Sequence, residues 1–202
     1  MAFLSLAAMA AALVALRLGL VHDPPKPSAP AGQVAPTVKR HLPAKPPAAG
    51  ERVVLIRKAD RVLALYREGK LAAAYPVALG PSSAGHKQRE GDGRTPEGEY
   101  YVCNRNAQSQ FHLFLGLSYP SARDAAAGYR AGLITKAQRE AIVAANAKHQ
   151  RPPWDTLLGG EVGIHGGGAS HDWTLGCIAL EDAAIEELWQ VLQVGDPVVV
   201  QP

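Results

Sequence analysis

The glycine-rich stretch over residues 163–180 carries the side chains whose types and spacing are best suited to chemistry. It contains Cys177, one of only two cysteines, and two of the seven histidines, His165 and His171. A cysteine thiolate is a strong nucleophile once a base has taken its proton. Gly176 lets the backbone approach a carbonyl closely, and the amides of Gly176 and Cys177 are the expected oxyanion donors. The stretch therefore predicts cysteine-dependent acyl transfer.

We expect His165, twelve positions before Cys177, to be the base. It ends a predicted strand, and Gly166 with the two glycines that follow it leaves space around the ring. A backbone carbonyl in this segment can orient the second ring nitrogen. His171, in a predicted loop, is the rival base, and Asp172 can orient either histidine.

Three alternatives to catalysis stay open on these residues alone. A free cysteine is commonly a small apolar residue of the core. In an exported protein, Cys103 and Cys177 could form a disulfide. His165, His171 and Cys177 could hold a metal ion, although such a site needs a further ligand and the two cysteines fit no common zinc spacing. We expect no cofactor.

The first 50 residues differ in composition from the rest of the chain. Residues 1–21 are apolar with Arg17 as the only charged side chain, which predicts either a cleaved signal peptide or an uncleaved membrane anchor. A third interpretation is that the true start, with a positive leader, lies upstream. Residues 22–50 hold eight prolines and predict an extended tether. We expect an exported domain over residues 51–202, in the periplasm or cell envelope, that contacts the membrane through the N-terminal segment.

The charge balance excludes a nucleic-acid partner for this domain. The formal net charge is +3 over 202 residues. Five of the 21 lysines and arginines and one of the 18 acidic residues precede residue 51, which leaves 16 basic and 17 acidic residues in the expected domain. A protein that binds nucleic acid needs a basic face on the domain itself, and the sequence predicts none.

The hydrophobic patterns predict a mostly β (α+β) fold with a helical insert. The stretch 80–98 is a long polar loop, and long ordered loops are often functional. We expect helices after residue 121, broken at Gly128, and from residue 135 to about 149. A further helix over 181–193 should begin just after Cys177. Strands are expected at residues 52–56, 61–66, 71–79, 99–103, 112–117, 161–164 and 197–200.

Two motifs in the same order resemble the YkuD-type L,D-transpeptidase family. His165-Gly166 followed by Thr174-Leu175-Gly176-Cys177 is similar to the family signature H-G … [S/T]-x-G-C. The run 95–100, T-P-E-G-E-Y, is similar to its T-P-x-G-x-[YF] segment. The G-H-K run at 85–87 and the segment 106–119 most resemble the YafK-like branch. The resemblance covers about residues 51–202 and implies a YkuD-like β-sandwich or mixed-sheet domain.

The resemblance implies an activity on the peptide stems of peptidoglycan. Cys177 would attack the carbonyl of a diaminopimelate residue, form a thioester and expel D-alanine, with His165 as the general base. An amine of a second stem would then take the acyl group in cell-wall cross-linking. Water as the acceptor would instead make the enzyme a carboxypeptidase or a hydrolase of peptidoglycan or of lipoprotein–wall links, with a wall-linked lipoprotein as a partner.

Four residues near the motifs are expected to contact the substrate: Arg94, His171, Trp173 and Thr174. Leu175 stands where many family members have histidine. The competing interpretation is a wall-binding module without catalysis, in which Cys103 and Cys177 are joined as a disulfide.

Overall fold

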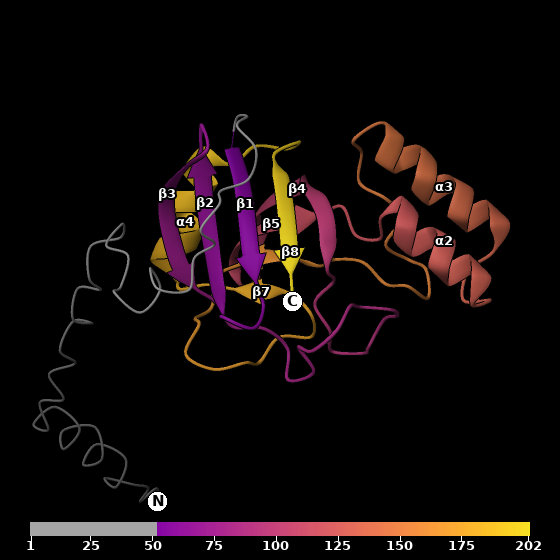
Figure 1. Ribbon diagram of the computed structural model, residues 1–202, viewed down its shortest axis with the longest axis horizontal. Helices are drawn as coiled ribbons and strands as arrows, with labels where there is room; N and C mark the ends of the chain where they lie inside the picture. Colours follow the sequence, from indigo (N-terminus) through magenta and orange to yellow (C-terminus); the bar gives the residue numbers. More distant parts are fainter. Residues whose placement is uncertain (1–51) are drawn as a thin grey trace, which may run out of the picture.

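A computed structural model of the chain describes residues 52–202 as one curved sheet with three helices (Figure 1). The predicted leader over 1–21 and tether over 22–50 lie outside the described residues, and the division of the chain at these points stays a prediction. None of the helices in residues 52–202 is long and apolar enough to span a membrane.

The first three strands form the expected antiparallel meander. They are β1 (Arg52–Arg57), β2 (Val62–Arg67) and β3 (Lys70–Pro76). Their apolar residues alternate, so that one face of the sheet enters the main core and the other forms a smaller cluster. The last strand, β8 (Pro197–Gln201), pairs in parallel with β1.

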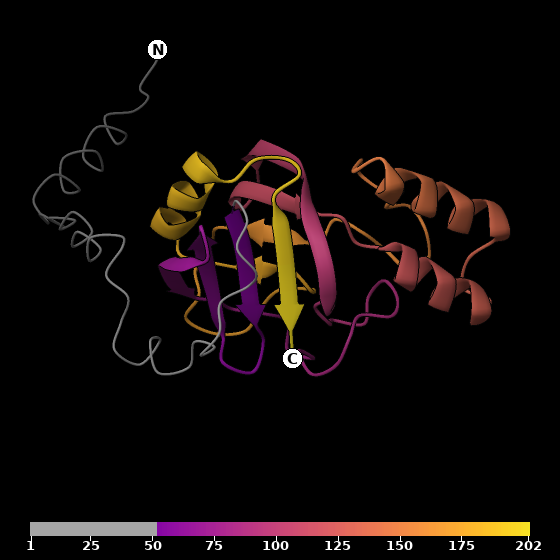
Figure 2. The same ribbon diagram turned by 45° about the horizontal axis from the view of Figure 1, so that its top comes forward.

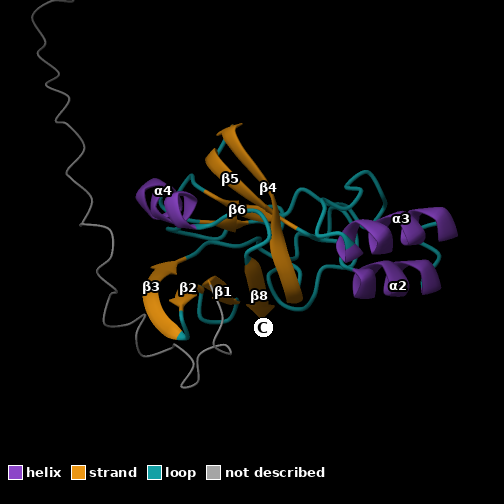
Figure 3. Cartoon of the chain, turned by 90° about the horizontal axis from the view of Figure 1, so that it is seen from above, coloured by secondary structure: helices purple, strands orange, loops and turns teal. Residues whose placement is uncertain are grey.

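The sheet curls over at β4 (Gly98–Ser109), which is longer than the predicted strand over 99–103. Its first part pairs with β8, and its remainder pairs with β5 (His112–Leu117) across two register shifts. Such irregularities bend a strand and increase its twist. The order β3-β2-β1-β8-β4-β5-β6-β7 therefore describes a half-barrel whose two halves face each other, as Figure 3 shows from above.

The short strands β6 (Gly163–His165) and β7 (Ile178–Ala179) complete the sheet and flank the two predicted catalytic residues. The predicted helix after Cys177, over residues 181–193, is confirmed, and the structure adds a short strand before it. Strand β7 comes first, and α4 begins only at Asp182. The thiol therefore lies at a strand start, and the dipole of α4 does not act on it directly.

Helix α4 (Asp182–Val191) packs into the concave side of the half-barrel. Ile185 and Leu188, one turn apart, are fully buried there, and Leu192 follows at the helix end. Figure 2 shows α4 at one end of the molecule and the helical insert at the other.

The insert is a hairpin of α2 (Ala122–Arg130) and α3 (Lys136–Ala147), and both helices begin with a capping box. The predicted break at Gly128 is wrong, because α2 continues through it. A Cβ at this position would lie 2.6 Å from a methyl carbon of Leu158, so the glycine allows close packing within the helix. His86 joins the hairpin to the 80–98 loop: its Nδ1 accepts from the Glu97 amide and its Nε2 lies 2.9 Å from Asp124.

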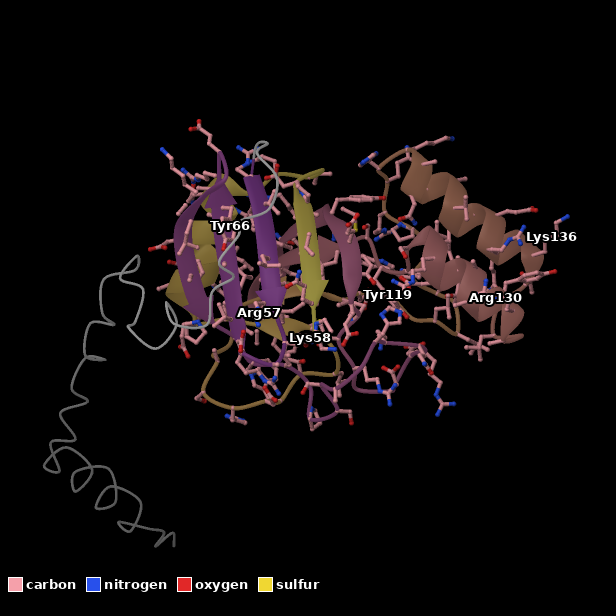
Figure 4. All side chains as sticks on the ribbon, in the orientation of Figure 1. Arg57, Lys58, Tyr66, Tyr119, Arg130 and Lys136 are labelled. Atoms are coloured by element: carbon pink, nitrogen blue, oxygen red, sulfur yellow. The ribbon has the colours of Figure 1, made fainter. Side chains whose placement is uncertain are left out.

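A buried lysine fixes the long loop over residues 80–98. Lys58, at the end of β1, has a side chain that is 3% exposed (Figure 4). Its Nζ donates to the carbonyls of Gly85 and Thr95 and to the Glu97 carboxylate, at 2.6, 3.0 and 2.8 Å. All three ammonium hydrogens are therefore used, as burial of a charged group requires.

We predict that Lys58→Met lowers the free energy of unfolding by about 3 kcal/mol, because Glu97 loses its partner and two loop carbonyls lose a donor. Urea denaturation of the described domain measures the change. Lys70→Met is the matched control, since Lys70 is exposed on β3, and it should shift stability by less than about 0.5 kcal/mol. Equal effects of the two substitutions would contradict the role of Lys58.

Candidate active site

Two loops that are distant in sequence meet where Gly176 lies against Arg94. Gly176 has a φ of 131°, and a Cβ there would be 2.6 Å from the Arg94 carbonyl oxygen. The amides of Trp173 and Thr174 both donate to the carbonyl of Leu79, which ties the same turn to the start of the long loop. The sequence suggested that Gly176 admits a substrate carbonyl. The structure adds that no larger residue fits against Arg94.

Cys177 follows this contact and carries a half-buried, protonated thiol. Its Sγ donates to the carbonyl of Glu161 at 3.4 Å. Burial raises the pKa of the Cys177 thiol to about 11, although the Gly163 amide and the charge of Lys87 oppose this rise. A base must therefore take the proton during reaction, because little thiolate is present at neutral pH.

His165 is held as a neutral base. Its Nδ1 lies 2.6 Å from the Gly166 carbonyl oxygen, which can only accept, so the proton is on Nδ1. Nε2 is thereby left with a free lone pair. Burial lowers the pKa of His165, and the Gly166 hydrogen bond only partly offsets this effect. Gly166 thus provides the backbone orientation that the sequence predicted.

Two aromatic side chains fix the plane of the imidazole. Phe111 stacks on His165 with ring centroids 4.7 Å apart, and Trp173 meets the same ring edge-on at 5.5 Å. The indole Nε1 of Trp173 donates to the carbonyl of Gly168. The predicted Trp173 therefore lies at the site, and its ring packs against the base.

Two clefts open at Cys177 and His165, and both of these residues line both clefts. We call the first the amide cleft; its volume is about 480 Å³ and its polar lining, besides His165 and Cys177, includes Asn104, Asn106, Gln108, Ser109, Gln110, Arg151 and Glu161. We call the second the glycine cleft; its volume is about 400 Å³ and its lining includes Lys87, Glu90, Gly91, Gly159, Gly160 and Trp173. A nucleophile at the junction of two clefts can meet one ligand from each.

Lys87 places a positive charge in the glycine cleft close to the nucleophile. Its side chain is 4% exposed, and its Nζ donates to Asp92 at 3.0 Å and to the carbonyl of Arg89 at 3.1 Å. The same nitrogen lies 3.7 Å from the position that a Cβ at Gly176 would occupy. A fixed cation at this place favours the thiolate form of Cys177.

The turn before Cys177 positions the backbone amides of Gly176 and Cys177. The Thr174 hydroxyl donates to the carbonyl of Cys177 at 2.8 Å and accepts from the Gly176 amide at 3.2 Å. The Gly176 amide is therefore occupied, and the Thr174 hydroxyl supports the turn, while Thr174 also lines the glycine cleft. Within residues 52–202, the Cys177 amide has no hydrogen-bond partner and is therefore available to donate to a ligand oxygen.

The structure does not bring the other predicted residues to the clefts. His171 is exposed beside Ser170, and Asp172 binds Arg61 and the Leu79 amide instead of a histidine. Arg94 contributes its carbonyl to the Gly176 contact, while its side chain lines neither cleft. No cluster of histidine, cysteine, aspartate and glutamate that could hold a metal ion occurs among the described residues.

The disulfide alternative is not supported, because both cysteines are free. Cys103 is buried within β4, where burial raises its pKa to about 12. Only Cys177 lines the clefts.

The side chains of the site that were not predicted from the sequence include Lys87, Phe111, Arg151 and Glu161. Lys87 had a local signal, because it stands in the G-H-K run of a loop that we expected to be functional. The other three come from a hairpin turn and from segments around the helical insert. Their proximity to Cys177 depends on the curl of β4 and the packing of the insert.

Comparison with known proteins agrees with this geometry. The family model of the YkuD L,D-transpeptidase catalytic domain matches residues 51–200. A search of curated proteins found no match. A mutant of the helical cell shape determining protein Pgp2 from Campylobacter jejuni is 23% identical, with a TM-score of 0.52 over 78% of this chain and 49% of that one. An L,D-transpeptidase from Stackebrandtia nassauensis is 13% identical, with a TM-score of 0.50 over 82% and 63%. The chain thus spans about half to two thirds of these structures, which share its fold.

We predict that alkylation of Cys177 by iodoacetamide accelerates about tenfold per pH unit from pH 7 to pH 10. The thiolate is the reacting species, and a pKa of about 11 lies above this whole range. Mass spectrometry at timed intervals measures the rate at each cysteine. A rate that levels off near neutral pH would instead indicate a thiolate–imidazolium pair.

We predict that Lys87→Met slows this alkylation about threefold to tenfold at pH 8, since loss of a nearby cation raises the thiol pKa. Lys70→Met removes a distant exposed charge and should leave the rate unchanged. A loss of folding in Lys87→Met is recognised by circular dichroism, and Lys87→Arg, which keeps the charge, should then retain the rate.

We predict that Gly176→Ala lowers the free energy of unfolding by about 2 kcal/mol more than Gly195→Ala does. Both glycines have positive φ, but only a Cβ at Gly176 meets another atom, the Arg94 oxygen, whereas Gly195 has open space around it. Urea denaturation of both variants measures the difference. Equal losses of stability in the two variants would mean that the positive φ alone, and not the contact with Arg94, determines the cost of the substitution.

Proposed function

The chain belongs to the YkuD family of L,D-transpeptidase catalytic domains, and from that premise we propose that it forms a Cys177 thioester with a peptidoglycan stem peptide and transfers it to an amine. The observation that carries the proposal is the shared position of Cys177 and His165 at the junction of two clefts. The family match supports a peptidoglycan-related function. The assignment of this chain to the YafK-like branch of the family stays a prediction.

The first half-reaction uses the neutral pair described above. Nε2 of His165 takes the thiol proton as Sγ attacks the carbonyl carbon of diaminopimelate. The oxyanion that develops meets the Cys177 amide. The carbon–nitrogen bond to D-alanine then breaks, and the leaving amine receives the proton from His165. The product is a thioester on Cys177 and free D-alanine.

The second half-reaction needs an acceptor. A neutral amine loses a proton to His165 as it attacks the thioester carbon, and sulfur leaves and is reprotonated. Two clefts at one thiol support an amine acceptor, because an acceptor can enter one cleft while the acyl chain occupies the other. Water in the same position gives a carboxypeptidase or a hydrolase of lipoprotein–wall links, which product analysis distinguishes.

We propose that the domain works in the cell envelope. The apolar residues 1–21 and the proline-rich residues 22–50 support this proposal, since together they suit a domain held away from a membrane near a fixed polymer. The wall-binding module is the weaker alternative, because it relied on a disulfide between two cysteines that are free in the structure.

We predict that the described domain releases D-alanine from diaminopimelate-containing tetrapeptide muropeptides and forms cross-linked dimers. Cys177→Ala should abolish both products, and His165→Gln should lower the rate at least about a hundredfold, as loss of a general base does. His171→Gln is the matched control and should only weaken the reaction. Chromatography with mass spectrometry measures the products. Full activity in Cys177→Ala, or a larger loss in His171→Gln than in His165→Gln, would contradict the mechanism.

A further inference from the structure

The amide cleft contains one cationic and one anionic side chain that have no ionic or hydrogen-bonding partner among residues 52–202. Arg151 and Glu161 are the only lysine, arginine, aspartate or glutamate side chains in its lining. The two also line an adjoining hollow together, yet they form no ion pair with each other. Within residues 52–202 neither side chain has another ionic or hydrogen-bonding partner. Both charges are therefore available to a ligand in the cleft.

Arg151 is held in place without using its donors. Its guanidinium carbon lies 5.0 Å from the centre of the Trp154 ring, and Trp154 is itself fixed by a hydrogen bond from Nε1 to the Tyr119 carbonyl. The preceding carbonyl, of Gln150, accepts from the hydroxyl of Tyr101 in β4. A stacked guanidinium keeps its planar fork of N–H groups, which matches the two oxygens of a carboxylate.

Glu161 brings the negative charge next to the nucleophile. Its backbone has a φ of 52°, and its carbonyl accepts the hydrogen bond from the Cys177 thiol. Its carboxylate is exposed at the border of the two clefts. A cationic group of a ligand can therefore bind near the reacting sulfur while an anionic group reaches Arg151.

The glycine cleft offers a different arrangement of charge. Its lysine, Lys87, is already bonded to Asp92, so it does not present a free cation to a ligand. Among the two clefts, only the amide cleft combines a free guanidinium with a free carboxylate and neutral amide side chains. The neutral amide side chains can hydrogen-bond to peptide groups. The guanidinium and the carboxylate favour a ligand that carries both a negative and a positive charge.

We propose that the amide cleft binds a free α-amino-acid head, with its carboxylate on Arg151 and its ammonium on Glu161. The inference rests on the proposed function, because a stem peptide offers such a head at the far end of the diaminopimelate side chain. A free D-amino acid that serves as acceptor offers the same chemistry. Arg151 is then the residue that distinguishes diaminopimelate from lysine, whose side chain has an ammonium group but no carboxylate.

The test compares three tetrapeptides as donors in D-alanine release: one with diaminopimelate, one with its side-chain carboxylate amidated, and one with lysine in its place. The wild-type domain should favour the diaminopimelate peptide by about tenfold to a hundredfold in kcat/KM, as a charged bidentate hydrogen bond allows. Arg151→Gln should remove most of this preference by slowing only that peptide. Glu161→Gln should slow the diaminopimelate and lysine peptides alike, since both carry the ammonium group.

Arg130→Gln is the matched control, because Arg130 lies at the outer end of the hairpin, away from the sheet (Figure 4). It should keep the wild-type preference. A second arm supplies free D-methionine as acceptor and measures its incorporation. If incorporation of D-methionine depends on Arg151 while the wild-type domain shows no preference among the three donor peptides, the cleft binds the acceptor. If Arg151→Gln changes neither arm, or slows all substrates equally, the inference is overturned.

A binding measurement separates failure of this inference from failure of the proposed function. If the wild-type domain releases no D-alanine, calorimetry with the Cys177→Ala protein compares the diaminopimelate peptide with its amide. If this protein binds the diaminopimelate peptide more tightly than its amide, and if Arg151→Gln removes that difference, the inference is supported although the proposed reaction fails. Equal binding of the two peptides in this experiment overturns the inference.

Discussion

The active site depends on the contact between the Arg94 carbonyl and Gly176, where two backbones come too close for any side chain. This contact joins a long polar loop to the turn that carries Cys177. Each partner is secured from its own side: Lys58 fixes the loop through three hydrogen bonds, and Asp172 ties the turn to Arg61 and Leu79. The position of the nucleophile is therefore set by charged side chains outside the clefts, of which Lys58 is buried and Arg61 and Asp172 are partly exposed.

Two lysines near this contact illustrate how the surroundings of a buried cation decide its effect. Lys58 is fully used by carbonyls and a carboxylate and lies away from the thiol, so its charge stabilises the loop. Lys87 is bonded to Asp92 but lies beside Gly176, so part of its field reaches Cys177. A lysine at the end of β1 thus maintains the shape of the loop, and a lysine within the loop adjusts the nucleophile.

The positions of most strands along the chain could be predicted from local signals, and so could the proximity of Cys177 and His165 to the same clefts. Alternating apolar residues mark the strands, and a histidine and a cysteine in a glycine-rich stretch indicate the chemistry. The curl of β4 could not be predicted, because it depends on register shifts that only pairing with β5 and β8 defines. Phe111 and Arg151 reach the site through that curl and through the packed hairpin. Arg94 was expected to bind substrate through its side chain, and the close contact of its carbonyl with Gly176 could not be predicted, because composition does not reveal backbone contacts.

The place of β8 between β1 and β4 governs when the domain can form. The strand that joins the two halves of the sheet is the last of the described strands, so β1, which pairs with β2 on one side, gains its second neighbour only from a strand almost 150 residues away. Such non-local pairing makes folding slow and prevents the half-barrel from closing during synthesis of its earlier strands. Loss of the last few residues would separate the meander from the half that holds the clefts, so synthesis must reach the end of the domain before any catalytic geometry exists.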